Sequence, residues 1–344
     1  MSLALGFARR ALRRRPLSTA AAEPRRTKTV TAMELQRMKR VGTPITMVTA
    51  YDYPSAMHVD AAGVDVVLCG DSVGMVALGY TTTQPVTLDE MLHHSRAVRR
   101  GLSLNGAPLL VCDLPFGSYE ESPEVAMRSA YRCLKEGSAD AIKLEGGTAV
   151  CESVRRIVQG GIAVMGHVGL TPQSISTLGG FRAQGRTAVK ARKVVDDALA
   201  LQDAGAFAVV VECVPAAVGR AVAAALEIPT IGIGAGQYCD GQVLVYHDLL
   251  GSINHPHHQR FVPNFCKLYA DVGEKSITGI KAFKADVISR SFPSEAYSPY
   301  TMPPEEAEKF AQMLQDDVDR RDEKKRAARK RIVDDDEYET IKLY

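Results

Sequence analysis

The sequence predicts an α/β protein with the (β/α)8 TIM-barrel fold. Eight apolar runs, several of them rich in β-branched residues, alternate with stretches of helical periodicity over about 240 residues. The runs are continuous, which is typical of parallel strands that are buried on both faces. Several of the helical stretches end at glycine, as helix C-caps do. An open, doubly wound sheet is the alternative that the same alternation allows.

The elements can be placed by their residue patterns. Strands are expected at 46–52, 65–72, 108–115, 141–147, 163–170, 206–214 and 229–236, with 241–251 as the choice for the eighth. Helices are expected at 55–63, 88–101, 122–137, 149–161, 187–205 and 215–227. A glycine-rich loop at 177–187 follows the fifth strand, and it is either a lid over the site or a plain surface loop.

The two ends of the chain differ from this pattern and divide it into three parts. Residues 1–30 carry eight basic side chains and one acidic side chain, with leucines that share one helix face. We expect a transit peptide there, mitochondrial rather than plastid, and a disordered basic tail is the alternative. Residues 31–300 would form the barrel. Residues 301–344 hold thirteen acidic and ten basic residues and predict a charged tail, disordered or partly helical from about 304 to 331.

Composition excludes several classes of function. Without its first 30 residues the chain has 34 basic and 39 acidic residues, a poor match for nucleic acid. No run of about 18 uncharged apolar residues exists, so no membrane-spanning helix is expected. The seven cysteines include no CxxC pair, and three of them lie inside apolar runs. They are interpreted as reduced thiols in a protein that is not secreted.

Polar residues gather at the carboxyl ends of six predicted strands. They are Asp52, Asp71 with Ser72, Asp113, Lys143 with Glu145, His167 and Glu212. A single aspartate after a strand is usually a helix cap, and a single histidine in an apolar strand is usually part of the core. In a barrel, however, all of these strand ends face one mouth, which is where the chemistry of this fold takes place.

The residue types at this mouth suggest chemistry on an anionic substrate. Asp71, Asp113 and Glu145 are hard oxygen donors that suit Mg²⁺. Lys143 could neutralise a substrate carboxylate, or it could form a Schiff base with a carbonyl group. Glu212 stands in an apolar run, a setting that makes a carboxylate a stronger base and suits it to remove an acidic C–H proton.

Longer motifs resemble one known family, ketopantoate hydroxymethyltransferase. They are TAYDYPSA (49–56), GDSVGM (70–75), DLPFGSY (113–119), KLEGG (143–147), GHVGLTPQS (166–174), FRAQGR (181–186), ECVP (212–215), IPTIGIGAG (228–236) and DGQVLV (240–245). The resemblance spans about residues 30–295. It implies a barrel of the phosphoenolpyruvate mutase and isocitrate lyase superfamily, a decameric assembly, and a step in pantothenate and coenzyme A synthesis.

The resemblance also implies roles for particular residues. The reaction would convert 3-methyl-2-oxobutanoate and 5,10-methylenetetrahydrofolate to 2-dehydropantoate through an enolate that Mg²⁺ stabilises. Its metal carboxylates map onto Asp71, Asp113 and Glu145, the last of them acting through water. Its keto-acid contacts map onto Asp71, Ser72, Asp113 and Lys143, with His167 at the site, and its proton acceptor maps onto Glu212. A C–C lyase of the same superfamily and a non-catalytic scaffold barrel are the alternatives.

Overall fold

The barrel in the computed structural model is closed and all of its strands are parallel. The structure describes residues 28–253 and 263–339, and the expected transit peptide lies almost wholly outside them. The strands are β1 (Ile45–Thr49), β2 (Val66–Cys69), β3 (Leu109–Asp113), β4 (Ala141–Lys143), β5 (Val164–Gly169), β6 (Ala208–Glu212), β7 (Thr230–Ile233) and β8 (Gly241–Leu244). They follow chain order, and β8 closes on β1 with Met47 opposite Val243. The predicted TIM barrel is thereby confirmed.

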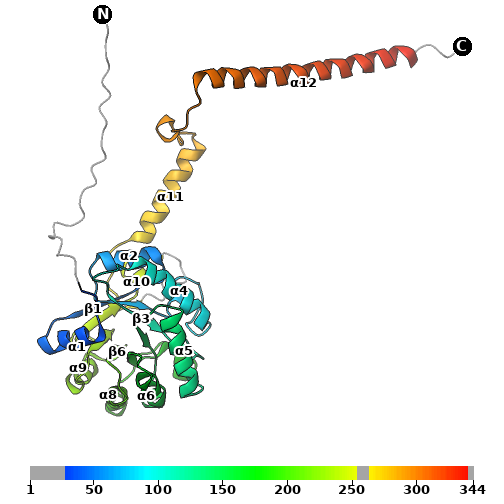
Figure 1. Cartoon of the computed structure of the whole chain (residues 1–344). Coiled ribbons are helices and arrows are strands. Elements are labelled where there is room, and N and C mark those ends of the chain that lie inside the picture. Colours follow the sequence, from blue (N-terminus) through cyan, green and yellow to red (C-terminus); the bar gives the residue numbers. More distant parts are fainter. Residues whose placement is uncertain (1–27, 254–262, 340–344) are drawn as a thin grey trace, which may run out of the picture. The chain divides into compact units, whose positions relative to one another are not determined.

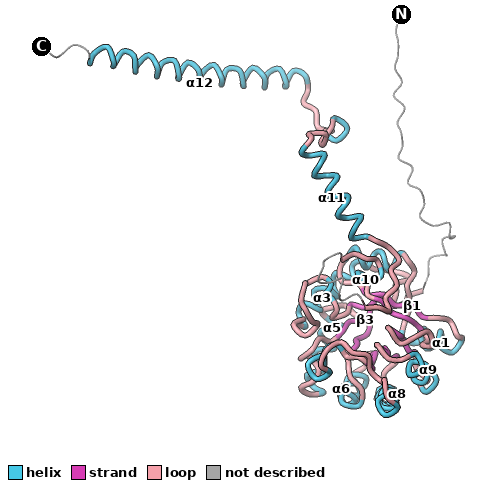
Figure 2. The backbone as a smooth tube through the Cα atoms, turned by 180° about the vertical axis from the view of Figure 1, so that it is seen from behind, coloured by secondary structure: helices cyan, strands magenta, loops and turns pink. Residues whose placement is uncertain are grey.

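The helices surround this barrel (Figure 1). The helices named in the argument are α2 (Tyr53–Ala61), α3 (Val73–Val76), α4 (Leu88–Gly101), α5 (Pro123–Lys135), α6 (Cys151–Gln159), α7 (Ile175–Leu178), α8 (Ala188–Asp203), α9 (Ala216–Ala225) and α10 (Tyr246–Leu249). All eight expected strands and all six expected helices form, but the strands are shorter at their ends than expected, and the second half of the expected eighth strand (241–251) is wrong, because it contains α10. In Figure 2 the strands form the centre of this unit and the helices lie outside them.

Five α-helices of the described residues were missed at the sequence level: the four-residue helices α3, α7 and α10, the longer α11 (Val272–Ile288), and α1. Helix α1 (Ala32–Val41) begins at Thr31, whose side chain accepts a hydrogen bond from the Glu34 amide, and it ends at Gly42, with φ of 71°. Its buried residues Leu35 and Met38 belong to the same apolar cluster as the barrel interior. Helix α1 therefore fills the barrel at the end opposite the carboxyl ends of the strands.

Side-chain alternation along the strands decides which residues enter the barrel. In β3, Val111 packs in the interior cluster, whereas Leu110 and Cys112 pack against the surrounding helices. In β6, Val210 takes the interior position and Val209 the outer one. Because strand side chains alternate with period 2, residues two positions further on point into the barrel mouth. This alternation positions the candidate site.

The chain after Glu274 forms a separate unit. It contains most of α11 (Val272–Ile288), a short 3-10 turn (Glu295–Tyr297) and α12 (Pro304–Glu339). Its side chains are exposed up to Arg331, and i,i+3 ion pairs such as Lys309–Glu306 stabilise α12. The expected charged helix from about 304 to 331 is thus confirmed. Among the described residues, no helix has the length and apolarity needed to cross a membrane.

Candidate active site

Four charged side chains enter the barrel mouth at interior positions of neighbouring strands. Asp113 ends β3, Lys143 ends β4, His167 lies in β5 and Glu212 ends β6. The strand register places Asp113 beside Lys143. In each strand the charged residue lies two positions after a residue of the barrel interior, so its side chain points to the same side. The strands alone therefore bring these groups together, and no loop is needed.

A buried ion pair joins two of these residues. Lys143 Nζ lies 2.7 Å from Asp113 Oδ1, and the side chains are 4% and 3% exposed. Burial by itself would lower the pKa of Lys143, but the charges of Asp113, Glu145 and Asp71 outweigh it and raise the pKa above its usual value. Lys143 is therefore a permanent cation at the site.

Asp71 lies directly against this pair. Its amide donates to Asp113 Oδ2 at 3.0 Å. Gly70 leaves room for this approach, since a Cβ atom there would lie 3.2 Å from Ser72 Oγ and would push that hydroxyl aside by a few tenths of an ångström. Burial and the charges of Asp113 and Glu145 raise the pKa of Asp71 well above its ordinary value. The folded chain thus carries a surplus of buried negative charge at this point.

A second group of contacts links Glu145, His167 and Glu212. His167 Nδ1 lies 3.4 Å from Glu145 Oε1, and His167 Nε2 lies 3.2 Å from Glu212 Oε2. Burial and the charge of Lys143 lower the pKa of His167, but the charge of Glu145 and the close contacts with both glutamates raise it to about 9. His167 is therefore protonated at neutral pH and bridges the two glutamates.

Glu212 differs from the other carboxylates in its access to the cavity. Its side chain is 17% exposed, whereas those of Asp113 and Glu145 are each 3% exposed. The interpretation of Glu212 as isolated in an apolar run is wrong, because His167 contacts it across the β5–β6 register. The run VVVECV gives no sign of that contact, which depends on a neighbouring strand.

Sequence reasoning missed Gln173, which ties the acidic residues together. Its side-chain amide donates to Asp71 Oδ2 at 2.8 Å and to the Leu114 carbonyl at 2.9 Å. Its backbone amide donates to Glu145 Oε2 at 3.0 Å. Gln173 is 1% exposed and lies in a 3-10 turn after β5. A single glutamine outside the strands has no periodic signal, and only its place in the motif GHVGLTPQS could have drawn attention to it.

Two other strand-end residues have different roles. Ser72 faces the cavity, and its Oγ lies 2.7 Å from the Tyr51 hydroxyl. Asp52 does not line the cavity; its carboxylate accepts from the Ser55 amide and caps α2. The helix-cap alternative therefore holds for Asp52 and fails for the other strand ends.

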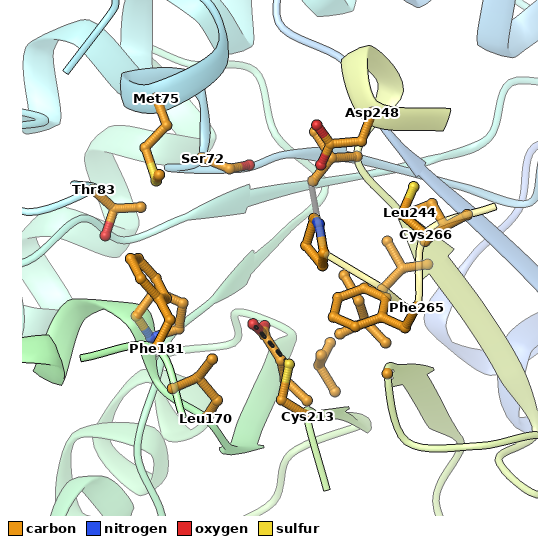
Figure 3. A pocket seen from close by; sticks show the side chains of 18 of the residues that line it. Ser72, Met75, Thr83, Leu170, Phe181, Cys213, Leu244, Asp248, Phe265 and Cys266 are labelled. Atoms are coloured by element: carbon orange, nitrogen blue, oxygen red, sulfur yellow. Dashed lines mark hydrogen bonds between the residues drawn. The ribbon is translucent and has the colours of Figure 1, made fainter. Parts of the chain in front are cut away.

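All seven candidate residues line one cavity of about 870 Å³. They are Asp71, Ser72, Asp113, Lys143, Glu145, His167 and Glu212. The outer wall is more apolar and includes Met75, Leu170, Leu244 and Phe265, as Figure 3 shows. The loop that follows α7 contributes Phe181, Arg182 and Arg186. That loop is therefore part of the cavity wall, and the alternative of a plain surface loop is wrong.

The cavity offers suitable donors for a divalent cation. Asp71, Asp113 and Glu145 supply three carboxylates against the cations Lys143 and His167, so an added positive charge would relieve repulsion. No three His, Cys, Asp or Glu side chains in the described ranges already converge as a metal cage. Mg²⁺ does not require one, because it usually binds through one or two carboxylates with substrate oxygens and water completing its shell.

The fold and the site together define a (β/α)8-barrel enzyme with its active site at the carboxyl ends of the strands. The sequence matches the model of the family described as ketopantoate hydroxymethyltransferase over residues 29–295, and the chain belongs to this family. The resemblance found in the motifs is confirmed.

Individual relatives agree with this assignment. The chain is 57% identical over 290 residues to 3-methyl-2-oxobutanoate hydroxymethyltransferase 1, mitochondrial, of Oryza sativa subsp. japonica, covering 84% of this chain and 79% of that protein. It is 55% identical to 3-methyl-2-oxobutanoate hydroxymethyltransferase of Moorella thermoacetica, covering 78% and 97%. A solved structure of 2,3-dimethylmalate lyase, a PEP mutase/isocitrate lyase superfamily member, matches with TM-score 0.47 at 14% identity, covering 84% and 98%.

Proposed function

We propose that this chain transfers a hydroxymethyl group from 5,10-methylenetetrahydrofolate to 3-methyl-2-oxobutanoate and yields 2-dehydropantoate. Membership in the ketopantoate hydroxymethyltransferase family supports the reaction. The observation that carries the mechanism is the pairing at the barrel mouth: a buried cation, Lys143, on one side and an accessible carboxylate, Glu212, on the other. An anionic keto acid with an acidic C3–H needs both groups.

Lys143 and Ser72 are proposed to hold the substrate carboxylate, with Asp71 and Asp113 lining the same part of the cavity. Lys143 stays charged, because the surrounding carboxylates raise its pKa. A Schiff base requires the neutral amine, so the charged state argues against that alternative. Lys143 thus acts by electrostatic attraction and orients the keto acid.

Glu212 is proposed to remove the C3 proton. Its carboxylate faces the cavity, and His167 fixes it from behind through the contact at 3.2 Å. His167 is a positioning residue in this scheme, because its other ring nitrogen faces Glu145. The resulting enolate forms a C–C bond to the one-carbon unit, water supplies the oxygen of the hydroxymethyl group as the bonds from that carbon to the folate nitrogens break, and tetrahydrofolate leaves with the protons.

Asp71 and Asp113 are proposed as direct ligands of Mg²⁺, with Glu145 acting through water. The indirect role of Glu145 rests on the family resemblance, and in this structure its two oxygens face His167 and accept from the Gln173 amide. Bound Mg²⁺ would supply Lewis-acid polarisation of the keto oxygen. Apart from that, the chain's own residues bind, orient and deprotonate the substrate.

Four further assignments are also proposals. Residues 1–30 act as a mitochondrial transit peptide, supported by the word "mitochondrial" in the names of the rice and Arabidopsis thaliana relatives at 56–57% identity. Residues 31–300 are proposed as the catalytic domain and residues 301–344 as a charged tail, and the compact unit that holds the barrel ends within the first range, at Glu274. The family resemblance supports a homodecamer.

The test is formation of 2-dehydropantoate by the purified full-length chain from both substrates, with Mg²⁺ and with EDTA. We expect product that depends on the metal. Product that persists in EDTA would contradict the metal assignment but leave the reaction intact. Cleavage of a C–C bond without folate would favour the lyase alternative, and metal binding without any turnover would favour the scaffold alternative.

A further inference from the structure

The catalytic groups make up only part of the cavity lining. A volume of about 870 Å³ is in the range of sites for drug-sized ligands, whereas the keto acid has only five carbons. The remaining wall carries two aromatic rings, Phe181 and Phe265, which are 45% and 37% exposed. Figure 3 shows these two rings on either side of Cys213, which follows Glu212 in the chain. The second part of the cavity therefore suits a flat, aromatic ligand that reaches the catalytic carboxylate.

The wall beside Phe181 is cationic. Arg182 and Arg186 line the same cavity from the loop after α7, and both are exposed. Neither arginine makes an ion pair within the described residues. The rest of the lining includes the carboxylates of Asp71, Asp113, Glu145, Glu212 and Asp248, which repel an anion. A second anionic group, one that Lys143 does not hold, is therefore attracted to the arginines.

The loop that carries these arginines is attached to the catalytic strand. The Gln184 amide donates to the Cys213 carbonyl at 2.9 Å, directly after β6. Gly179, Gly180 and Gly185 adopt positive φ values of 68°, 113° and 69°, which lets the loop turn sharply on both sides of Phe181 and Arg182. The hydrogen bond thus anchors the backbone of the loop next to the residue that follows Glu212.

An unsatisfied polar atom marks the same wall. Thr83 is 3% exposed, and its Oγ1 has no hydrogen-bond partner in the described part of the chain. Thr83 lines the cavity, and in Figure 3 it lies near Phe181. A buried hydroxyl without a partner costs free energy, and a ligand with ring nitrogens could satisfy it.

We propose that Phe181, Arg182 and Arg186, with Phe265 opposite, form the binding site of the folate co-substrate, in which the two arginines bind its glutamate carboxylates. The inference rests on the proposed function, since it specifies where the second substrate binds. The folate has the required chemistry: a flat ring system at the reacting end and carboxylates at the far end. The arginines are at the exposed end of the cavity, so further glutamates on the ligand would extend into solvent.

The test compares Arg182→Gln, Arg186→Gln and the double variant with the unaltered enzyme. At saturating keto acid, each single substitution should raise the KM for 5,10-methylenetetrahydrofolate about fivefold, as expected for loss of a partly exposed ion pair, with little change in kcat. Arg192→Gln is the matched control. Arg192 is 72% exposed, pairs with Asp196 on α8 and does not line the cavity, so its loss should leave this KM unchanged.

A folate analogue without the glutamate distinguishes loss of carboxylate binding from a general disturbance of the active site. A methylenetetrahydropteroyl analogue without the glutamate should have a raised KM in the unaltered enzyme, and the double variant should no longer discriminate between the two ligands. Phe181→Ala should raise the KM for both ligands by the same factor, because the ring contacts the part that they share. The assignment of the arginines would be overturned if the double variant kept the KM of the unaltered enzyme for the folate. It would also be overturned if the double variant still preferred the complete folate over the analogue without glutamate to the same degree as the unaltered enzyme.

Exchange of the keto-acid C3 proton into deuterated water, measured without folate, distinguishes this inference from the proposed function. We expect the arginine variants to retain exchange at the rate of the unaltered enzyme. An unaltered enzyme that exchanges the proton but makes no product with folate would overturn the proposed co-substrate. Normal turnover by the unaltered enzyme, combined with unaffected folate KM values in the variants, would overturn only the location of the folate site.

Discussion

The substitution Lys143→Met tests whether a buried cation holds the acidic cluster together. Lys143 and Asp113 are 4% and 3% exposed and lie 2.7 Å apart. Removal of one partner from such a pair leaves an uncompensated buried charge, and it typically costs 3–5 kcal/mol. Burial already raises the pKa of Asp113 despite the nearby lysine, so uptake of a proton by Asp113 should limit the loss to about 3 kcal/mol at pH 7.

The free energy of unfolding is measured by urea denaturation in EDTA, at one protein concentration. Lys193→Met is the control, because Lys193 pairs with Asp197 at 2.9 Å but is 72% exposed and should cost less than about 1 kcal/mol. The loss in Lys143→Met should also shrink as the pH falls. A carboxyl group whose pKa is raised in the folded state holds its proton where the unfolded state has released it, so acid favours the folded variant. Equal losses in the two variants would refute the account of the buried pair.

Three other predictions follow from the site and the chain ends. The pKa of His167 is raised from 6.5 to about 9, so its charged form stabilises the fold by about 3 kcal/mol below pH 6.5, and this stability is lost as the pH rises through 9. The urea midpoint should therefore fall between pH 6.5 and 9. An equally steep fall in His167→Asn would contradict the assignment. Asp113→Ala should raise the Mg²⁺ concentration for half-maximal activity at least about tenfold, and an unchanged titration would remove Asp113 from the ligands. A reporter fused to residues 1–35 should enter mitochondria, and a diffuse cytosolic signal would reject the transit peptide.

The sequence was sufficient to predict the barrel and the chemistry at its mouth. The apolar runs are long enough to define eight strands, and parallel strands place all their carboxyl ends on one side. Asp113, Lys143, His167 and Glu212 could be found because each interrupts or ends an apolar run. The same pattern also selected Asp52, which caps α2, since a strand-end aspartate has the same sequence context in both roles.

Contacts between distant segments could not be predicted in this way. The bridge from Glu145 through His167 to Glu212 joins three strands, and Gln173 reaches Asp71 from about a hundred residues away in sequence. The short helix α1 fills the barrel with only two fully buried side chains, too few for a clear periodicity. The second half of the cavity is built by a loop, whose conformation depends on its glycines and on its attachment to β6.

The most direct test of the central claim is C3 proton exchange in Glu212→Gln. The amide keeps the size of the side chain but cannot accept the proton as a carboxylate does. We expect the variant to bind 3-methyl-2-oxobutanoate with affinity close to that of the unaltered enzyme, measured by calorimetry with Mg²⁺. Exchange of the C3 proton into deuterated water, followed by NMR, should fall about 10²- to 10⁴-fold. Exchange within tenfold of the unaltered rate would contradict the assignment of Glu212 as the base.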